Sequence, residues 1–480
     1  MGQIWSVLGV LLMMQGFTLD AWVEPKERSW VSWNGMLRCQ IESLFTPRTQ
    51  DELVALVKEA GKRGKRIKVI GSGHSLSPIA LPEAGEWVIS LENYAEILGV
   101  DSERQTITVR GGATLKQVNE ALDSHGLALE NLGTISDQTV GGVFQTGTHG
   151  TGKAYGPLHT QIIELTLING KGELKRVTPE GEPLLFRACQ CGLGTLGIVE
   201  TVTLRAVPAQ PLCEEMGAVE WPEVLDRVKE LVQANDHVRF HWFPYTQRVG
   251  MWTANPTREK QQESTKDAAS FSRLIAEVAE ERNDPQIRSI EDILELGPSD
   301  PAIVARFNRA FFEADYGKTS TRIDRSDQIL NADCSAHSHC CAMETAFPIG
   351  HTKPFLLELQ ELVEKNDLPA HTSVEIRFVK ADQALLSPTY SDHSDDLFCF
   401  VSIVSIHPNC RPVPYESYFQ LFQELAERHQ GRLHWGKMGR FDPAHLKQVY
   451  PRWEQFRELQ KQEDPSGLFL NTFTRHILES

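Results

Sequence analysis

The sequence lacks several features that would assign it to a common protein class. Its nine cysteines form no CxxC pair, which argues against the usual zinc sites and, in a chain of 480 residues, against a disulfide scaffold. Positive charge is in deficit, since 48 Lys and Arg face 64 Asp and Glu and the formal net charge is −16. Nucleic acids and anionic membrane surfaces require a basic face, so the composition argues against either as the main partner. The cysteine content is typical of a mostly reduced compartment.

The sequence also has no apolar run at its N-terminus that could span a bilayer. Residues 4–14 are apolar, but they are too few to cross a membrane and no Lys or Arg precedes them. Residues 1–40 therefore form a lead with two open interpretations, a weak export signal or a buried or interfacial helix. The sequence leaves cytoplasmic, membrane-associated and exported locations open.

Two nucleotide-binding motifs are present only in incomplete form. Residues 147–153 have the spacing G-x-x-x-x-G-K, but Ala154 follows where the Walker motif needs a hydroxyl for magnesium. Gly71 and Gly73 begin a Rossmann-like spacing, but Leu76 replaces its third glycine. The sequence therefore indicates neither a nucleotide triphosphatase nor a Rossmann fold.

A glycine turn after a strand is the first candidate site. Residues 66–70 alternate polar and apolar side chains and predict a strand that leads into the segment 71–75, Gly-Ser-Gly-His-Ser. Two glycines one residue apart permit positive φ, so successive N–H groups can point into one concavity that suits a pyrophosphate. Such turns are common, and this one alone does not establish a binding site.

A second glycine-rich segment lies at residues 131–152. Its glycines alternate with hydroxyl residues, which makes a backbone rich in accessible N–H donors for an anion or a flat polar ring. A mobile linker is the alternative, but Ile135, Val140 and Val143 have spacings typical of packed residues. We therefore favour a binding segment.

The character of the chain changes after Pro208 and Pro211. Residues 258–295 are charged and helix-forming and contain no phosphate-type loop, which predicts a solvated face or an insertion. A cluster of histidines and cysteines follows, but its spacings match no usual zinc pattern, so we expect no metal there. This cluster consists of Cys334, His337, His339, Cys340 and Cys341.

Two small polar groups near the C-terminus are candidate catalytic residues. Residues 373–379 alternate like a strand, so Glu375 and Arg377 project from the same face. On a solvated face this pair is a minor salt bridge, whereas in a pocket it is a preorganised carboxylate and guanidinium. His434 and Lys437 lie within one four-residue stretch, which could equally be a structural turn.

Taken together, these segments resemble the aldonolactone oxidoreductases of the vanillyl-alcohol-oxidase flavoprotein group, which includes sugar-lactone and alditol oxidases. The resemblance covers about residues 45–205 and 375–471. It implies an α+β fold with a two-subdomain PCMH-type FAD-binding domain at residues 41–210. A cap domain at residues 211–480 would follow, with an antiparallel sheet flanked by helices and a C-terminal segment that returns to the flavin.

The resemblance also implies FAD as cofactor and a set of residues that contact it. In this family the histidine of Gly-x-Gly-His-Ser is bonded to the 8α-methyl of the flavin, and His74 occupies that position. The implied cofactor residues are Gly71, Ser72, Gly73, His74, Ser75, Gly133, Thr134, Ser136, Gly141, Gly142, Thr146, Gly147, Thr148, His149, Gly150, Gly197, Ile198 and Lys437.

The implied catalytic residues lie in the C-terminal block. Glu375 and Arg377 resemble the family's substrate-binding pair, and His434 and Lys437 resemble a motif that brings a lysine to the flavin. Either Glu375 or His434 could accept the proton of the substrate hydroxyl, and the sequence does not choose between them. In addition, Glu344 and Pro348 resemble a family signature at a strand edge.

The activity implied by the resemblance is oxidation of a small sugar-derived lactone, such as L-gulono-1,4-lactone, by hydride transfer to flavin N5. A glycine at the position of Gly133 is typical of the family's oxidases, which implies O2 as acceptor and H2O2 as product. Three alternatives remain: an alditol such as xylitol or sorbitol as substrate, a dehydrogenase that uses a quinone or cytochrome, and a non-catalytic flavin-binding protein. The last would not need Glu375, Arg377 and Lys437 together.

Overall fold

The computed structural model describes residues 28–480 except 263–268, 298–299, 332–338, 409–410 and 412. Two predictions fall outside the described residues. They concern the apolar run at residues 4–14, and Cys334 and His337 of the cluster in which we expect no metal. In the part that the structure describes, no helix is long and apolar enough to cross a membrane.

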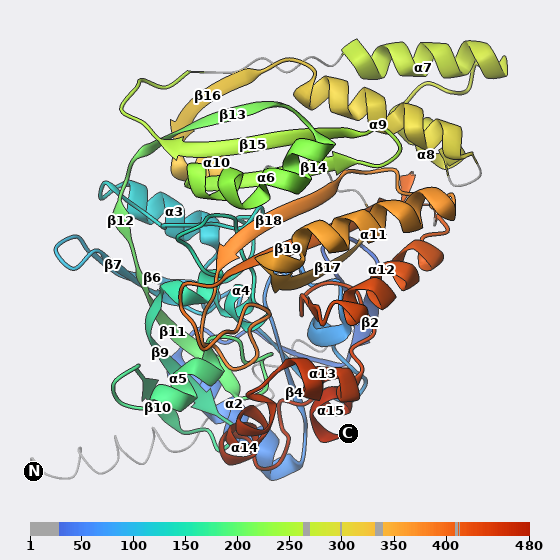
Figure 1. Ribbon diagram of the computed structural model, residues 1–480. Helices are drawn as coiled ribbons and strands as arrows, with labels where there is room; N and C mark the ends of the chain where they lie inside the picture. Colours follow the sequence, from blue (N-terminus) through green and yellow to red (C-terminus); the bar gives the residue numbers. More distant parts are fainter. Residues whose placement is uncertain (1–27, 263–268, 298–299, 332–338, 409–410, 412) are drawn as a thin grey trace, which may run out of the picture.

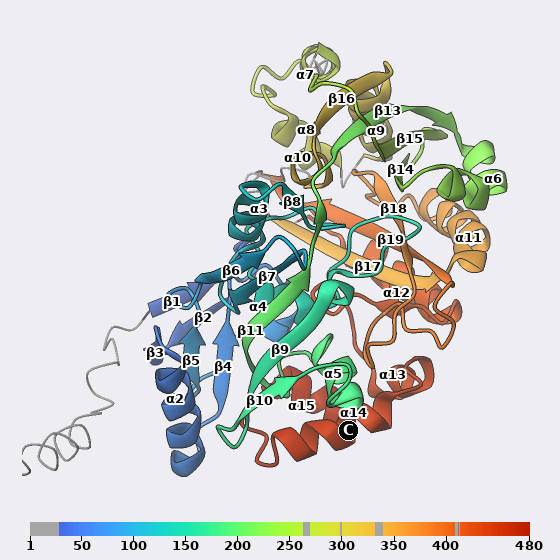
Figure 2. The same ribbon diagram turned by 90° about the vertical axis from the view of Figure 1, so that its left-hand side faces the viewer.

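The first half of the chain contains a three-stranded parallel sheet and a five-stranded antiparallel sheet, each with helices beside it (Figures 1 and 2). The parallel sheet has the order β3 (Ser43–Phe45), β5 (Trp87–Ser90) and β4 (Ile67–Ile70). The antiparallel sheet has the order β10 (Leu174–Val177), β9 (Ile162–Asn169), β11 (Gly197–Arg205), β7 (Thr106–Arg110) and β6 (Ile97–Asp101). The helices are α2 (Gln50–Arg63), α3 (Leu115–Asp123), α4 (Val140–Gln145) and α5 (Pro183–Cys189), with short 3-10 turns η2 (Pro78–Ala80) and η3 (Leu158–Gln161).

Two short strand pairs complete this half. They are β1 (Arg28–Val31) with β2 (Arg38–Ile41), and β12 (Val207–Pro208) with β8 (Leu127–Ala128). Local sequence explains where the helices begin: Thr49 accepts a hydrogen bond from the Glu52 amide, and the Glu52 carboxylate accepts one from the Thr49 amide, a capping box at the start of α2.

The second half is built on one eight-stranded antiparallel sheet. Its order is β16 (Ser320–Arg325), β13 (Pro211–Glu220), β15 (Arg248–Pro256), β14 (His237–Phe243), β18 (Val374–Lys380), β19 (Leu397–Ile406), β17 (Cys340–Pro348) and β20 (Arg432–Leu433). One face is covered by α6 (Trp221–Ala234), α11 (Thr352–Lys365) and α12 (Glu416–Arg428). Trp221 of α6 stacks on Trp242, and Phe355 of α11 packs on Phe347. The other face is therefore left for the first half of the chain.

The segment that the sequence predicts as charged and solvated forms a helical layer with its own core. The helices are α7 (Ala269–Arg282), α8 (Ile290–Leu296), α9 (Pro301–Tyr316) and α10 (Ser326–Leu330), and the first three lie at one end of the sheet (Figure 1). Helices α7 and α8 agree with the helical prediction for this segment, although residues 258–262 and 283–289 are not helical. The prediction of a solvated face is only half correct. Apolar residues such as Leu274, Val278 and Ile293 are buried in one cluster because the charged residues occupy the opposite helix faces.

The last elements return to the first half of the chain. They are α13 (Pro443–Val449), α14 (Trp453–Glu463) and α15 (Thr472–Glu479), and they lie beside α5 and below the parallel sheet (Figure 2). The amide of Ile67 on β4 donates to the carbonyl of Leu468 at 2.8 Å, and Leu468 and Phe469 are buried in the cluster of α2 and the parallel sheet.

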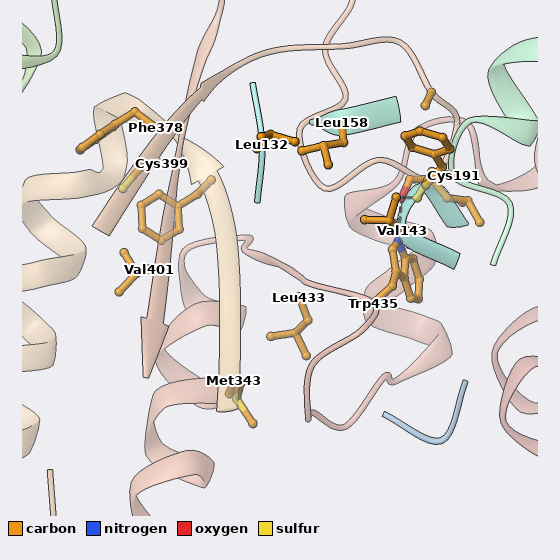
Figure 3. Close-up of a cluster of buried hydrophobic side chains, with 14 of the residues drawn as sticks. Leu132, Val143, Leu158, Cys191, Met343, Phe378, Cys399, Val401, Leu433 and Trp435 are labelled. Carbon is orange, nitrogen blue, oxygen red and sulfur yellow. Dashed lines mark hydrogen bonds between the residues drawn. The ribbon is translucent and has the colours of Figure 1, made fainter. Parts of the chain in front are cut away.

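The core is continuous between the two halves. Figure 3 shows part of it. Phe378, Cys399 and Val401 of the large sheet share one cluster with Leu132 and Val143 of the glycine-rich segment. The architecture confirms the predicted α+β class. The exact domain boundaries at residues 40 and 210 stay a prediction.

Candidate functional site

A large open cavity, with an empty volume of about 960 Å³, lies between the parallel sheet and the glycine-rich segments. The strand predicted before the first glycine turn is β4, and it delivers residues 71–75 to the cavity wall. The predicted cofactor residues that line it are Gly71, Ser72, Gly73, His74, Ser75, Gly141, Gly142, Thr146, Gly197 and Ile198. The remaining predicted cofactor residues lie outside this lining: Gly133, Thr134, Ser136, Gly147, Thr148, His149, Gly150 and Lys437.

Two positions in the first glycine turn require glycine, one because the loops meet there and one because of its backbone conformation. A Cβ on Gly71 would lie 2.0 Å from Oγ1 of Thr139, so only glycine lets the two glycine-rich segments touch. Gly73 has φ +70°, in the left-handed region that side chains disfavour. Gly142 and Gly194 also form part of the cavity wall. Such a cradle of backbone suits a phosphate-bearing cofactor.

The ring of His74 is held at the mouth of this loop without a charge. Its Nδ1 lies 3.1 Å from the hydroxyl of Ser72, and its ring packs on that of Trp33 with centroids 5.2 Å apart. Its Nε2 is buried and has no hydrogen-bond partner. Burial lowers the pKa of His74 to about 4, despite the opposing charge of Asp137. The Nε2 atom of this neutral ring is therefore not engaged by another polar group of the described residues.

Lys68 also lines the cavity and was not predicted. Its ammonium donates to the carbonyl of Ile79, and burial lowers the pKa of Lys68 to about 8 against the charges of Glu86 and Glu83. Lys68 lies between apolar residues on β4. This alternation predicts that Lys68 and its neighbours point to opposite faces of the strand, but it does not predict that both faces are enclosed.

On the large sheet, strand register places two rows of polar and aromatic side chains on the face turned toward the first half. Residues directly opposite one another in antiparallel strands share a face. The first row is Glu344, Ser402, Glu375 and His241. The second row is Phe400, Arg377, Arg239 and Trp252. The structure thus resolves the sequence alternative: Glu375 and Arg377 face the interior.

Arg377 is the hub of these rows. Its guanidinium contacts Glu344 Oε1 at 2.5 Å and Glu375 Oε2 at 3.4 Å. It also donates to the main-chain carbonyl of His149 at 3.4 Å, which joins the sheet to the second glycine-rich segment. The His149 ring in turn stacks on Phe400, with centroids 3.5 Å apart. The predicted substrate pair and one predicted cofactor segment therefore meet at a single guanidinium.

Glu344 is a buried anion in this cluster. Its side chain is fully buried, and its Oε1 lies 3.3 Å from Nε2 of His149 as well as against Arg377. Burial opposes ionisation, but the charge of Arg377 and the contact with His149 prevail and hold the pKa of Glu344 well below its usual range. His149, Glu344 and His434 have the residue types of a metal site and approach within 4.8 Å. However, Oε1 of Glu344 is already engaged by the guanidinium of Arg377, and this positive charge opposes the binding of a cation there.

The predicted place of Glu344 at a strand edge is wrong. Glu344 lies in the middle of β17, between β19 and β20, whereas Pro348 is the last residue of that strand. Both residues of the signature lie within a nine-residue strand, where they serve different purposes. Pro348 ends the strand, and Glu344 neutralises Arg377.

Glu375 is the more accessible of the two carboxylates in these rows, since its side chain is 21% exposed whereas that of Glu344 is buried. Arg239 lies 3.7 Å from the other oxygen of Glu375, and its guanidinium stacks over Trp252. Burial raises the pKa of Glu375, but Arg377, His241 and Arg239 outweigh it, so the pKa lies below the ordinary value. Arg239 and His241 were missed by sequence reasoning, although the alternation of residues 237–243 contained the signal.

The motif at residues 434–437 packs against the His74 loop. The amide of Leu76 donates to the Gly436 carbonyl at 2.7 Å, and the Ser77 hydroxyl donates to the Trp435 carbonyl at 2.6 Å. Trp435 is fully buried and donates through Nε1 to the Leu386 carbonyl. The C-terminal block and the first glycine turn, more than 350 residues apart in sequence, are thus direct neighbours.

These observations fit the expected FAD. The cavity offers a glycine cradle, the unpartnered Nε2 of His74 and the backbone around Gly197 and Ile198. The neutral His74 ring, the loop of residues 71–75 and the segment 141–146 would hold the cofactor, with Arg377 and Glu375 at the junction of the two halves.

Known proteins are similar to this chain over most of its length. A model of the D-arabinono-1,4-lactone oxidase family matches residues 202–477, and a model described as an FAD binding domain matches residues 41–178. The chain is 33% identical to L-gulonolactone oxidase of Scyliorhinus torazame over 92% of this chain and 96% of the relative, and 31% identical to that of Bos taurus over 93% and 97%. L-gulono-1,4-lactone dehydrogenase of Mycobacterium tuberculosis is 29% identical over 94% of this chain and 99% of the relative.

A solved structure shares the fold over nearly the whole chain. Cholesterol oxidase from B. sterolicum superposes with a TM-score of 0.77 and 17% sequence identity, covering 97% of this chain and 98% of that one. At this identity the likeness concerns the fold alone, and it confirms the predicted PCMH-type FAD-binding architecture followed by a sheet-containing domain.

Proposed function

Because the chain belongs to the aldonolactone oxidase family of FAD flavoproteins, we propose that it oxidises L-gulono-1,4-lactone or a related aldonolactone, with O2 as acceptor and H2O2 as product. The observation that carries the proposal is the enclosed pair of Glu375 and Arg377, joined through His149 to the glycine-rich segment. The relatives named L-gulonolactone oxidase, which align over more than nine tenths of the chain, support the substrate class.

In this proposal the protein binds and orients the substrate while FAD, when bound, supplies the hydride acceptor. The guanidinium of Arg377 and the carboxylate of Glu375 can hold a substrate hydroxyl between a fixed donor and a fixed acceptor. Arg377 and Lys437 supply positive charge where the reaction produces negative charge in an enclosed site, which is worth a few kcal/mol in catalysis.

The acceptor is the part of the proposal that the relatives divide on, since both oxidases and dehydrogenases align with the chain. Gly133 supports the oxidase. The chain packs closely here: a Cβ on Gly133 would lie 3.2 Å from Cγ2 of Thr148 and 3.5 Å from the carbonyl of His149. A bulkier residue would therefore press on the segment that carries His149.

A panel of γ-lactones and alditols with the purified holoenzyme tests the function. We expect peroxide release and stoichiometric oxygen consumption with L-gulono-1,4-lactone or another aldonolactone, and at least tenfold lower kcat/KM for xylitol and sorbitol. Turnover only with a quinone or cytochrome would replace the oxidase proposal by the dehydrogenase. A flavin that no lactone or alditol reduces would contradict an enzymatic role in this class.

The covalent flavin bond through His74 has its own prediction. We expect denatured, acid-precipitated protein to retain yellow fluorescence, and His74→Ala to lose it while the native variant still binds FAD non-covalently in the glycine cradle. His125→Ala, a change to an exposed histidine on the same half of the chain, is the matched control and should retain the bound flavin. Equal flavin retention after denaturation of His74→Ala would disprove the histidyl bond.

A further inference from the structure

We propose that His434 is a positioning residue and not the proton acceptor, so that Glu375 takes the proton of the substrate hydroxyl. This inference rests on the proposed function, and it concerns a choice that the sequence leaves open. It starts from the hydrogen bonds of the His434 ring, which determine where the ring can carry hydrogen.

The lone pair of Nδ1 is already used. The backbone amide of Gly436 donates to Nδ1 of His434 at 3.0 Å, and the contact is buried. An amide N–H can only donate, so Nδ1 carries no hydrogen, and in the neutral ring the hydrogen is on Nε2. A general base needs a free lone pair. Neither nitrogen of His434 offers one.

The surroundings of the ring also keep it neutral. His434 is 6% exposed, and the charged or titratable groups facing it are Glu344 on β17, His149 in the glycine-rich segment, Lys437 and Arg377. Burial lowers the pKa of His434 to about 3, and the opposing charge of Glu344 does not compensate.

What the ring does instead is to hold Gly436 in a turn between three parts of the fold. The main chain of His434 anchors this turn, because its amide donates to the Glu344 carbonyl on β17 and its carbonyl accepts from the Lys437 amide, both at 2.9 Å. Gly436, held by Nδ1 of the ring, accepts from Leu76, which directly follows the loop of residues 71–75. The ring therefore helps to fix the position of that loop relative to the sheet.

Glu375 is then the remaining acceptor among the candidates named from the sequence. It is ionised, partly accessible and 3.4 Å from Arg377, which can hold the hydroxyl oxygen. In the step, the hydroxyl O–H bond breaks and its proton goes to the Glu375 carboxylate. The O–H electron pair would form the carbonyl, and the C–H electron pair would leave with the hydride to FAD when it is bound, so charge and atoms balance.

The test compares two amide replacements of His434. In His434→Asn, Oδ1 occupies the place of Nδ1 and can accept the Gly436 amide, whereas in His434→Gln the acceptor lies one bond farther along the side chain. We expect His434→Asn to keep kcat/KM within about threefold and to keep the wild-type pH profile, and His434→Gln to lose about tenfold together with flavin retention and melting temperature. His371→Gln, at a buried histidine whose Nε2 accepts the Ile406 amide outside the site, controls for the loss of a ring.

A base role would give a different result. Both variants would then lose about 10²-fold or more, with a changed acid limb and recovery by added imidazole, and this outcome would overturn the inference. A second measurement needs no turnover: ¹⁵N spectra of the labelled holoenzyme should show His434 with a bare Nδ1 and a protonated Nε2. If the lactone is never oxidised but the spectra show this tautomer, the proposed function fails while the assignment of the ring stands; a protonated Nδ1 overturns the assignment itself.

Discussion

Arg377→Met is expected to reduce kcat/KM by at least about 10³-fold and to lower the free energy of unfolding by about 3–5 kcal/mol at neutral pH, the usual effect of removing one partner of a buried ion pair. The substitution removes the donor to substrate, and it also leaves the fully buried carboxylate of Glu344 without its cation. Denaturant unfolding and steady-state kinetics measure the two effects separately.

The loss of stability depends on pH in a defined direction. In the wild type the pKa of Glu344 is lowered, so its contribution to stability is present above about pH 4.3, the value in an unfolded chain, and is lost as pH falls through the lower folded value. In Arg377→Met the buried carboxylate of Glu344 is uncompensated and its pKa is raised, so the variant loses folding stability as pH rises. The variant should therefore be closer to the wild type at pH 5 than at pH 7.

A double variant separates charge from catalysis. Arg377→Met with Glu344→Gln removes both charges, and we expect it to recover most of the lost stability while activity stays low. If Arg377→Met unfolds at the wild-type midpoint at both pH values, or if the double variant is no more stable than the single one, the ion pair does not have the role described.

Glu375→Gln is expected to lower kcat by about 10²–10⁴-fold, the range for a general base, with a much smaller change in KM and with the flavin still bound. The amide keeps the size of the side chain and the acceptor for Arg377 but cannot take a proton. Because the pKa of Glu375 is lowered, wild-type kcat should fall only below about pH 4.3, and this acid limb should be absent from the variant.

A matched control is available on the far face of the sheet. Glu358 on α11 also has a lowered pKa, because contacts with His429 and Arg428 outweigh its burial, but it lies away from the site. Glu358→Gln should keep wild-type kcat and the acid limb. A Glu375→Gln enzyme within tenfold of wild-type kcat would contradict the assignment of the base.

Local sequence patterns predicted the parts of the site but not how they meet. Period-two alternation correctly placed Glu375 and Arg377 on one face, and the glycine spacing correctly marked the loop of residues 71–75 as part of a cavity wall. Whether that face was solvated depended on which half of the chain packs against it. No local pattern encodes such a contact.

The role of Glu344 as a buried anion could not be predicted from its local sequence. Its neighbours in sequence are apolar or small, and its partners are His149, Arg377 and His434, which come from three separate segments. A buried carboxylate is recognisable only once its compensating charges are located, and these are set by strand register across the sheet. Arg239 and His241 are an intermediate case, since their alternation was visible but their interior direction was not.

The packing of Leu468 and Phe469 against α2 and the parallel sheet has a consequence for synthesis of the protein. The ribosome makes the parallel sheet among the first hundred residues, yet one wall of its core arrives only with residues near the end. The turn at residues 434–437 that holds the His74 loop is also made late. The nascent chain must therefore keep an incomplete core until residues 468 and 469 are made, and cofactor capture is expected only after that point.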